Sequence, residues 1–511
     1  MSEPRDGRAK VLFILTHRLG DILQAFPAFA LARRRLPQAQ LHLLCDDTSV
    51  GLAQLCEDLD EVIPFPRLQL LPGAAYGPAF KVERLLALGE DLKARGYTHV
   101  VNLMGNLSAA LMASLGRVPG QAEGGRAFGP VGAKAVEQRW GRLLLAVPAA
   151  RAWQPFHLSE IFLRLTAECL GVDPELQAAG LKVDRARGLE LVRQLAPQGD
   201  DAGWLALRRP WVGLQGGASK SLRKPPAAWL RSFGREFLGQ VGGTLFLLGT
   251  QAEAEGFQPL LRTLSPSQKR RVVNACGTSD VRGLTDLVSA LDAVVSVDTF
   301  TLHLAAAAGT PVLGLYPGPA SPHETGPWGS GHLVLWSDSA GGPCACERAC
   351  DGGTDCWERL HPELAVGALG LLLVKGETAA LKGRRVRAFE TGLDRRGYRL
   401  RSVDGGRERD VDEEQLASLA RTWALGAPGT QPLAGGAASE GFRSLAQALR
   451  QGGEGVSEAL VLRKEPADWF RAQALYARAE DGTWSAGALR DVAEGCEFFS
   501  AGNPVTVRRA S

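Results

Sequence analysis

The segment with the clearest chemical potential reads VDTFTLH at residues 297–303, directly after an apolar run typical of a buried strand. We expect a helix to begin within a few residues of Asp298, with Thr299 or Thr301 as its cap. The free N–H groups and the positive dipole end of such a helix bind anions such as phosphate. A phosphate held there would lie within reach of His303. In the alternative, Asp298 only caps the helix and His303 packs in the core.

A basic loop follows another expected strand, with the sequence QGGASKSLRKPP at residues 215–226. Its small residues permit a close approach of the backbone, and the cations Lys220, Arg223 and Lys224 follow Ser219 within five positions. Loop, hydroxyl and cations together suit a diphosphate leaving group, whose charge must be neutralised as its bond breaks. The alternative is a solvated basic loop with no ligand.

Two carboxylates also follow expected strands. Glu253 comes after the strand at 245–249 and would accept hydrogen bonds from ribose hydroxyls, as acidic residues do in dinucleotide folds. Asp21 follows the strand at 10–16 and would project from the carboxyl edge of its sheet toward a cleft, where a general base belongs. Each carboxylate also has an alternative role within its own segment, without a ligand. Glu253 suits the first turn of a helix, and Asp21 suits an N-cap.

The elements that position these residues alternate between strand and helix. Apolar runs at 10–16, 41–45 and 61–65 are separated by amphipathic or short connecting segments, which predicts a parallel sheet with helices on both faces. The rhythm is lost over 173–210, which we interpret as a linker, and it restarts with a strand at 211–215. Two Rossmann-like halves with a ligand cleft between them are therefore expected.

The predicted domains are a first Rossmann-like domain at 1–190, a second Rossmann-like domain at 205–375 and an appended C-terminal region at 376–511. In the appended region charged runs alternate with small residues, and a flexible insert is expected near 426–440. The sequence gives no function for this region.

Composition excludes several classes of protein. The 511 residues are 45% hydrophobic with a formal net charge of +3, so no bulk field indicates nucleic-acid binding. Neither a G-x-G-x-x-G nor a G-x-x-x-x-G-K-[ST] motif occurs in these loops, which disfavours a dehydrogenase and a P-loop NTPase. The polar first ten residues and the short apolar runs predict a cytoplasmic protein with no signal peptide or membrane span.

Four cysteines cluster after the second expected sheet, at Cys344, Cys346, Cys350 and Cys356. Their spacing lacks the C-x2-C pair of a zinc ribbon. A structural metal, reduced thiols and a labile disulfide all remain open.

Taken together and in this order, the segments resemble glycosyltransferase family 9, the heptosyltransferases, from about Lys10 to Val374. The most specific match is the stretch Ser296 to Leu304, which the family writes Ser-Val-Asp-Thr-Gly-x-x-His-Leu. The matched positions are Gly20, Asp21 and Pro27; Gly217 to Ser219; Arg223 to Pro226; Gly249 and Glu253; and Ser296 to Leu304.

The resemblance implies a GT-B fold and an inverting transfer of heptose, or a similar sugar, from ADP-heptose to a lipopolysaccharide core acceptor. The domain at 1–190 would then lie on the acceptor side, and the domain at 205–375 would bind the nucleotide-sugar donor. Asp21 would be the general base, and Arg223 and Lys224 would assist departure of the ADP pyrophosphate. The implied donor-binding residues are Ser219, Glu253, Asp298, Thr299, Thr301 and His303. The scheme needs no metal or other cofactor, since the ADP-sugar is a co-substrate. The partners would be a nucleotide sugar and a lipid-linked or core oligosaccharide at the inner face of the inner membrane, which leaves the protein cytoplasmic or peripheral there.

Three positions depart from the family pattern. Arg223 stands where the family has Lys, Pro225 stands where it has Trp, and Phe300 stands where it has Gly beside the pyrophosphate. Arg keeps the charge but changes its geometry, and Phe would narrow or reshape the donor site. Two alternatives therefore stay open: a related transferase that uses another nucleotide sugar for a different surface glycan, and a degenerate GT-B protein that serves as a binding or scaffold protein.

Overall fold

The computed structural model describes residues 9–16, 19–70, 78–104, 109, 112–113, 126–131, 147–150, 157–196, 207–219, 221–318, 320–337, 355–374, 386–394 and 397–403. The expected insert at 426–440 lies outside these residues, as do Lys220, Cys344, Cys346 and Cys350.

The first sheet is parallel and has the strand order β3-β2-β1-β4-β5-β6, which is the order of a Rossmann unit. Its central strand is apolar and buried from Val11 to Leu15, as expected for a strand covered on both faces. The strands are β1 (Lys10–Leu15), β2 (Gln40–Asp46), β3 (Glu61–Phe65), β4 (His99–Asn102), β5 (Arg126–Val131) and β6 (Val147–Ala150).

The second sheet has the order β14-β13-β12-β11-β10-β7-β8-β9. It is parallel from β12 to β9, and the hairpin β13–β14 adds two antiparallel strands at one edge. The strands are β7 (Trp211–Gln215), β8 (Thr244–Leu248), β9 (Val272–Asn274), β10 (Ala293–Val297), β11 (Val312–Tyr316), β12 (Leu333–Trp336), β13 (Arg387–Asp394) and β14 (Gly397–Ser402).

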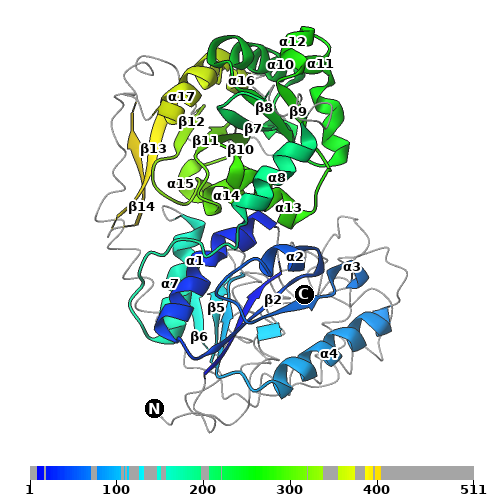
Figure 1. Ribbon diagram of the computed structural model, residues 1–511. Coiled ribbons are helices and arrows are strands. Elements are labelled where there is room, and N and C mark those ends of the chain that lie inside the picture. The colour runs from blue at the N-terminus through cyan, green and yellow to red at the C-terminus, as the bar shows by residue number, and fades with distance from the viewer. Residues whose placement is uncertain are drawn as a thin grey trace, which may run out of the picture.

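Helices flank both sheets, and α1 and α14 lie between the two units (Figure 1). The helices are α1 (Leu19–Arg35), α2 (Val50–Ala53), α3 (Arg67–Leu70), α4 (Pro78–Ala94), α7 (Leu158–Leu170), α8 (Arg185–Leu195), α10 (Ala227–Glu236), α11 (Gln258–Leu261), α12 (Pro266–Lys269), α13 (Val281–Ala290), α14 (Phe300–Ala307), α15 (Pro322–Thr325), α16 (Asp355–Arg359) and α17 (Pro362–Val374). Short turns of other helix types cover Asp47–Ser49, Ser221–Arg223, Phe237–Val241 and Gln251–Phe257. Within the described part of the chain, no helix is both long and apolar enough to cross a membrane.

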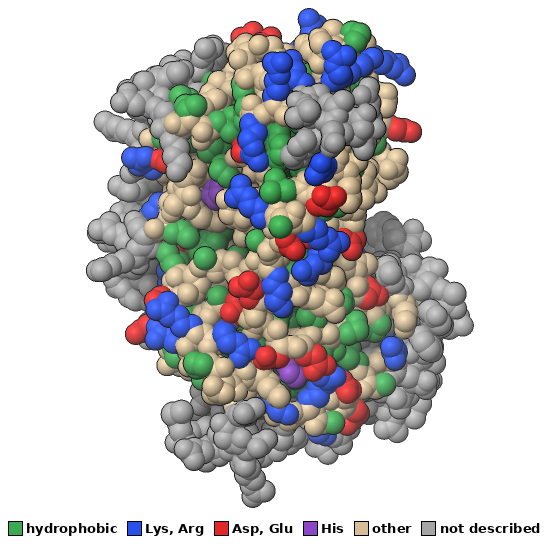
Figure 2. Space-filling view, viewed as in Figure 1, with side chains coloured by type: hydrophobic (Ala, Val, Ile, Leu, Met, Phe, Trp, Pro, Cys, Tyr) green, Lys and Arg blue, Asp and Glu red, His purple; other side chains and the backbone are tan. Residues whose placement is uncertain are grey.

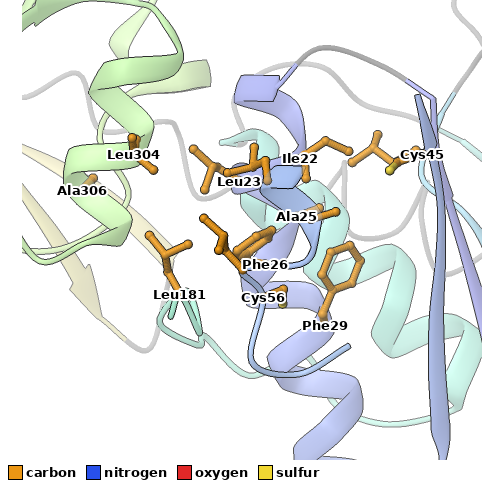
Figure 3. Close-up of a cluster of buried hydrophobic side chains, with 14 of the residues drawn as sticks. Ile22, Leu23, Ala25, Phe26, Phe29, Cys45, Cys56, Leu181, Leu304 and Ala306 are labelled. Atoms are coloured by element: carbon orange, nitrogen blue, oxygen red, sulfur yellow. The ribbon is translucent and has the colours of Figure 1, made fainter. Parts of the chain in front are cut away.

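One hydrophobic cluster runs through both units. It joins Ile22 and Leu23 of α1 to Leu304 and Ala306 of α14, with Leu181 beside them (Figure 3). The carboxyl ends of β1 and β10 lead into these two helices, so the edges of the two sheets that carry the expected site residues face one another. The packing therefore brings the two sets of loops into one region.

The interpretation of 173–210 as a linker is wrong in part, because α8 lies within it. Asp184 caps this helix by accepting a hydrogen bond from Arg187 N, and its own N–H donates to Asp286 Oδ1 on α13 at 2.9 Å. The sequence pattern did not predict α8 because the hydrophobicity of this helix is low, and only its residues Gly188 and Val192 are buried.

Candidate functional site

Three predicted site residues meet at the start of α14. Arg223 donates from Nη1 to Asp298 Oδ2 at 2.6 Å, and His303 Nε2 lies 3.5 Å from Asp298 Oδ1. The side chains of Arg223, Asp298 and His303 are 19%, 10% and 5% exposed. The 3-10 turn Ser221–Arg223 positions the arginine, while the end of β10 and the first turn of α14 position the other two.

The charges in this cluster favour an ionised Asp298. Burial by itself raises the pKa of this carboxyl, but the hydrogen bond and charge of His303 and the charge of Arg223 outweigh it, and the pKa is lowered below its usual value. Two buried nitrogens, Arg223 Nε and His303 Nδ1, have no hydrogen-bond partner among the described residues. Buried polar groups are normally paired, so these nitrogens are suited to contact a bound ligand.

The two threonines of the motif have different roles from simple caps. Thr299 occupies the N-cap position of α14 in an extended conformation, but no cap hydrogen bond forms from its side chain, whose hydroxyl lies 3.0 Å from that of Ser296. Thr301 is buried and its hydroxyl bonds the side chain of Gln215 at the end of β7. The expected helix start at 299–303 is thus present, and it is tied to the neighbouring strand.

Glu253 is a carboxylate in the first turn of a helix, as one of its two interpretations predicts, and it also lies beside the glycine loop. Its Oε2 accepts a hydrogen bond from Thr250 N at 2.7 Å in a capping box, as a first-turn carboxylate would. Its Oε1 faces the glycine loop, where a Cβ on Gly217 would lie only 1.5 Å away. The carboxylate therefore lies directly beside the loop that leads to Ser219 and Lys224, both of which are exposed.

Asp21 lies inside α1 and not in a loop before it. The helix begins at Leu19, so Asp21 is in its first turn and is not the N-cap of a helix that starts at Ile22. The preceding residue, Gly20, lies close to the cluster of the other unit: a Cβ added to it would lie 3.2 Å from His303 Cδ2 and 3.9 Å from the Cα of Phe300. Asp21 thus follows a residue that lies close beside His303.

His157 is a neighbour of the site that sequence reasoning missed. It caps α7, where Nδ1 accepts from Ser159 N at 3.1 Å and Nε2 donates to the carbonyl of Gly326 at 2.9 Å. Burial lowers its pKa to about 3, although the hydrogen bond to Gly326 opposes this effect. The imidazole is therefore neutral, with the proton on Nε2. A histidine two residues before Ser-Glu at a helix start offers no distinctive signal in a single sequence.

The cysteine cluster is described only at Cys356, which lies in α16 as a free thiol. Over the ranges that the structure covers, no group of three or more His, Cys, Asp or Glu side chains is arranged to hold a metal ion. The remaining three cysteines lie outside these ranges, so the alternatives for the cluster stay as the sequence left them.

A model of glycosyltransferase family 9 (heptosyltransferase) matches residues 85–351, just over half of the chain. The chain belongs to glycosyltransferase family 9. It is therefore a glycosyltransferase, which confirms the family expected from the motifs.

Relatives of this family member agree with the assignment. Lipopolysaccharide heptosyltransferase 2 of Escherichia coli is 23% identical over 326 residues, which cover 62% of this chain and 85% of the relative. The solved structure of E. coli ADP-heptose lipopolysaccharide heptosyltransferase II superposes with a TM-score of 0.55 at 19% identity, over 72% of this chain and 99% of that one. A family 9 glycosyltransferase from Veillonella parvula gives a TM-score of 0.57 at 14% identity, over 72% and 98%. These structures confirm the expected GT-B fold.

Proposed function

We propose that this glycosyltransferase moves a heptose, or a closely similar sugar, from ADP-heptose to a lipopolysaccharide core acceptor with inversion at the anomeric carbon. The observation that carries the proposal is the cluster of Arg223, Asp298 and His303 at the start of α14, close to Gly20 on α1. The choice of heptose as the sugar and of lipopolysaccharide as the acceptor rests on the names of the relatives.

In the proposed reaction the acceptor hydroxyl attacks the anomeric carbon, and the bond between that carbon and the pyrophosphate oxygen breaks. Asp21 takes the proton of the hydroxyl, and ADP leaves with the electron pair of the broken bond. Arg223, Lys224, Ser219 and the N-terminus of α14 with Thr299 stabilise the departing pyrophosphate. Asp298 and His303 line the sugar side, Thr301 fixes the helix start, and Glu253 Oε1 accepts from the ribose.

The departure at Phe300 is compatible with this scheme. Its half-buried side chain packs against the cluster that joins α1 to α14. The ring thus contributes to the contact between the two units. This packing supports a position for the Phe300 ring at the edge of the proposed donor site and not inside it.

A thermal-shift titration with ADP-heptose, ADP, a UDP-sugar and a GDP-sugar separates the proposal from its alternatives. Selective stabilisation by ADP and ADP-heptose is expected, because a ligand that binds only the folded state raises the melting temperature. Selective stabilisation by another nucleotide would favour a related transferase for a different surface glycan. No stabilisation by any of them would favour a binding or scaffold protein.

The proposed role of Asp21 as the general base can be tested by substitution. Asp21→Asn should lower kcat by roughly 100-fold to 10,000-fold, the range for loss of a general base, with little change in ADP affinity. Radiolabelled or coupled ADP-release assays give kcat, and calorimetry gives the affinity. Glu175→Gln is a matched control at the far end of α1, where Glu175 pairs with Arg34 and Arg35. An Asp21→Asn protein with full activity would exclude Asp21 as the base.

A further inference from the structure

Gln215 occupies the centre of the carboxyl edge of the second sheet, and the proposed reaction assigns it no role. It is the last residue of β7, which lies between β10 and β8. The residue is 5% exposed, in a strand whose other residues are apolar or glycine. A buried amide at this place needs partners for both of its ends.

Each end of the amide has a partner on a different segment. In the orientation that satisfies all neighbours, Nε2 donates to Thr301 Oγ1 at 2.9 Å and to the carbonyl of Leu248 at 3.3 Å, and Oε1 accepts from Gly217 N at 3.2 Å. One side chain thus bonds the first turn of α14, the end of β8 and the glycine loop after β7.

These three segments carry the proposed donor contacts. The first turn of α14 holds His303, the end of β8 leads to Glu253, and the glycine loop leads to Ser219. The loop also lies tightly against its other neighbours, since a Cβ on Gly216 would come 2.4 Å from the ring of Phe257. Gln215 therefore holds the loop on one side while Phe257 and Glu253 border it on the other.

We propose that Gln215 is a positioning residue that sets the spacing of the three segments that hold the nucleotide diphosphate. This role rests on the proposed function of the site as a nucleotide-sugar site. A leucine of similar size would deprive Gly217 N and the Thr301 hydroxyl of their partner while leaving the strand apolar. The loop and the helix start would then separate or rotate to find other partners, because an unpaired buried polar group is costly.

Hydrogen exchange of the free protein tests the structural half of the proposal. Gln215→Leu should speed amide exchange in both 216–219 and 299–303 relative to the unmodified protein. Thr285→Val is the matched control, since Thr285 is a buried threonine of α13 whose hydroxyl donates to Val281 O at 2.8 Å. This control should leave exchange in both segments unchanged. Unchanged exchange in the Gln215→Leu protein would overturn the proposal.

Calorimetric titration with ADP and initial-rate kinetics test the functional half. The Kd for ADP and the KM for the donor should rise roughly tenfold in Gln215→Leu, with the acceptor KM unchanged. Thr301→Val should act in the same direction and Thr301→Ser should not, because serine keeps the hydroxyl. In the double variant Gln215→Leu with Thr301→Val, the fold increase in the Kd for ADP should be smaller than the product of the increases in the two single variants, because the two side chains bond each other.

The outcomes separate this proposal from the proposed function. If the unmodified protein binds UDP or GDP in place of ADP, that nucleotide is used in the same titrations. If it binds no nucleotide, the proposed function fails and the exchange experiment alone decides the role of Gln215. If it binds ADP and Gln215→Leu binds ADP equally well, Gln215 does not position the donor site.

Discussion

Among single residues, Asp298 is the one that contacts both other members of the cluster, Arg223 and His303. It accepts from Arg223 across the site and faces His303 one turn along α14. A carboxylate with so little exposure is stable only because the charge of Arg223 and the neighbouring imidazole of His303 compensate for its lost hydration. The same arrangement that would hold a donor therefore also contributes to the stability of the free protein.

Asp298→Asn should reduce the free energy of unfolding at pH 7 by about 3 kcal/mol, because Arg223 would lose its buried partner. The pKa of Asp298 is lowered in the folded protein, so this contribution is present above the ordinary carboxyl pKa of about 3.9 and is lost as the pH falls through the lowered pKa. Urea unfolding from pH 7 down to pH 3 measures the difference between the two proteins.

The difference should stay constant from pH 7 to about pH 5 and shrink below about pH 4. Asp280→Asn provides the control, since Asp280 caps α13 and asparagine caps helices equally well. A difference for Asp298→Asn that did not shrink in acid would contradict the ionised pair.

At the scale of elements, the hairpin β13–β14 ties the two units together at the edge of the second sheet. The N–H of Tyr398 donates to Glu160 Oε1 on α7. The Tyr398 ring stacks on Trp328 with the ring centroids 6.0 Å apart, and it packs at a tilt against His157 with the centroids 4.4 Å apart. Trp328 in turn donates from Nε1 to the carbonyl of Gln177, after α7, at 2.9 Å. The hairpin comes from the region that the sequence left without a function.

Tyr398→Ala should destabilise the protein by about 3 kcal/mol, because it removes a buried ring that packs against both Trp328 and His157. Tyr398→Phe is the matched control and should be nearly neutral, since the Tyr398 hydroxyl is buried without a hydrogen-bond partner among the described residues. Equilibrium unfolding in urea distinguishes the two. Equal losses in both variants would show that the hydroxyl, and not the ring, carries the stabilisation.

The local signals predicted the elements that carry their own pattern. The apolar run at Ala293–Val297 and the motif after it gave the strand, the helix start and the residues Asp298 and His303. Patterns that depend on distant partners were not accessible: β13 is a strand because it pairs with β12 and β14 because it pairs with β13, although both carry charged residues. Gln215 and His157 matter through neighbours more than 80 residues away in the chain, which no local spacing reveals.

At the scale of the whole molecule, the two units are joined by a continuous core. The face in Figure 2 shows basic and acidic side chains intermingled, in keeping with the net charge of +3. Long-range charge therefore contributes little to binding, and the local cations at Arg223 and Lys224 supply the charge at the proposed pyrophosphate site.

Gly20→Ala tests how closely the two units must approach. The new Cβ would lie 3.2 Å from His303 Cδ2, so the imidazole or α1 must shift by a few tenths of an ångström. We expect kcat/KM to fall about tenfold, with no loss of stability because alanine favours helix over glycine by about 1 kcal/mol.

Gly51→Ala provides the comparison, since Gly51 lies in α2 with nothing within 4 Å of the new Cβ. That variant should gain stability by a similar amount and keep full activity. If Gly20→Ala were as active as Gly51→Ala, the contact between Gly20 and His303 would have no part in catalysis.

The packing of α1 against α14 also bears on how such enzymes acquire new acceptors. A chimera that exchanged the whole first unit for that of another family member would bring a foreign α1 to the face of Leu304 and Ala306. Shape mismatch there would move Asp21 relative to Arg223 even if every site residue were retained. An active chimera should therefore require that the residues around Ile22, Leu23 and Leu181 come from the same parent protein as α14.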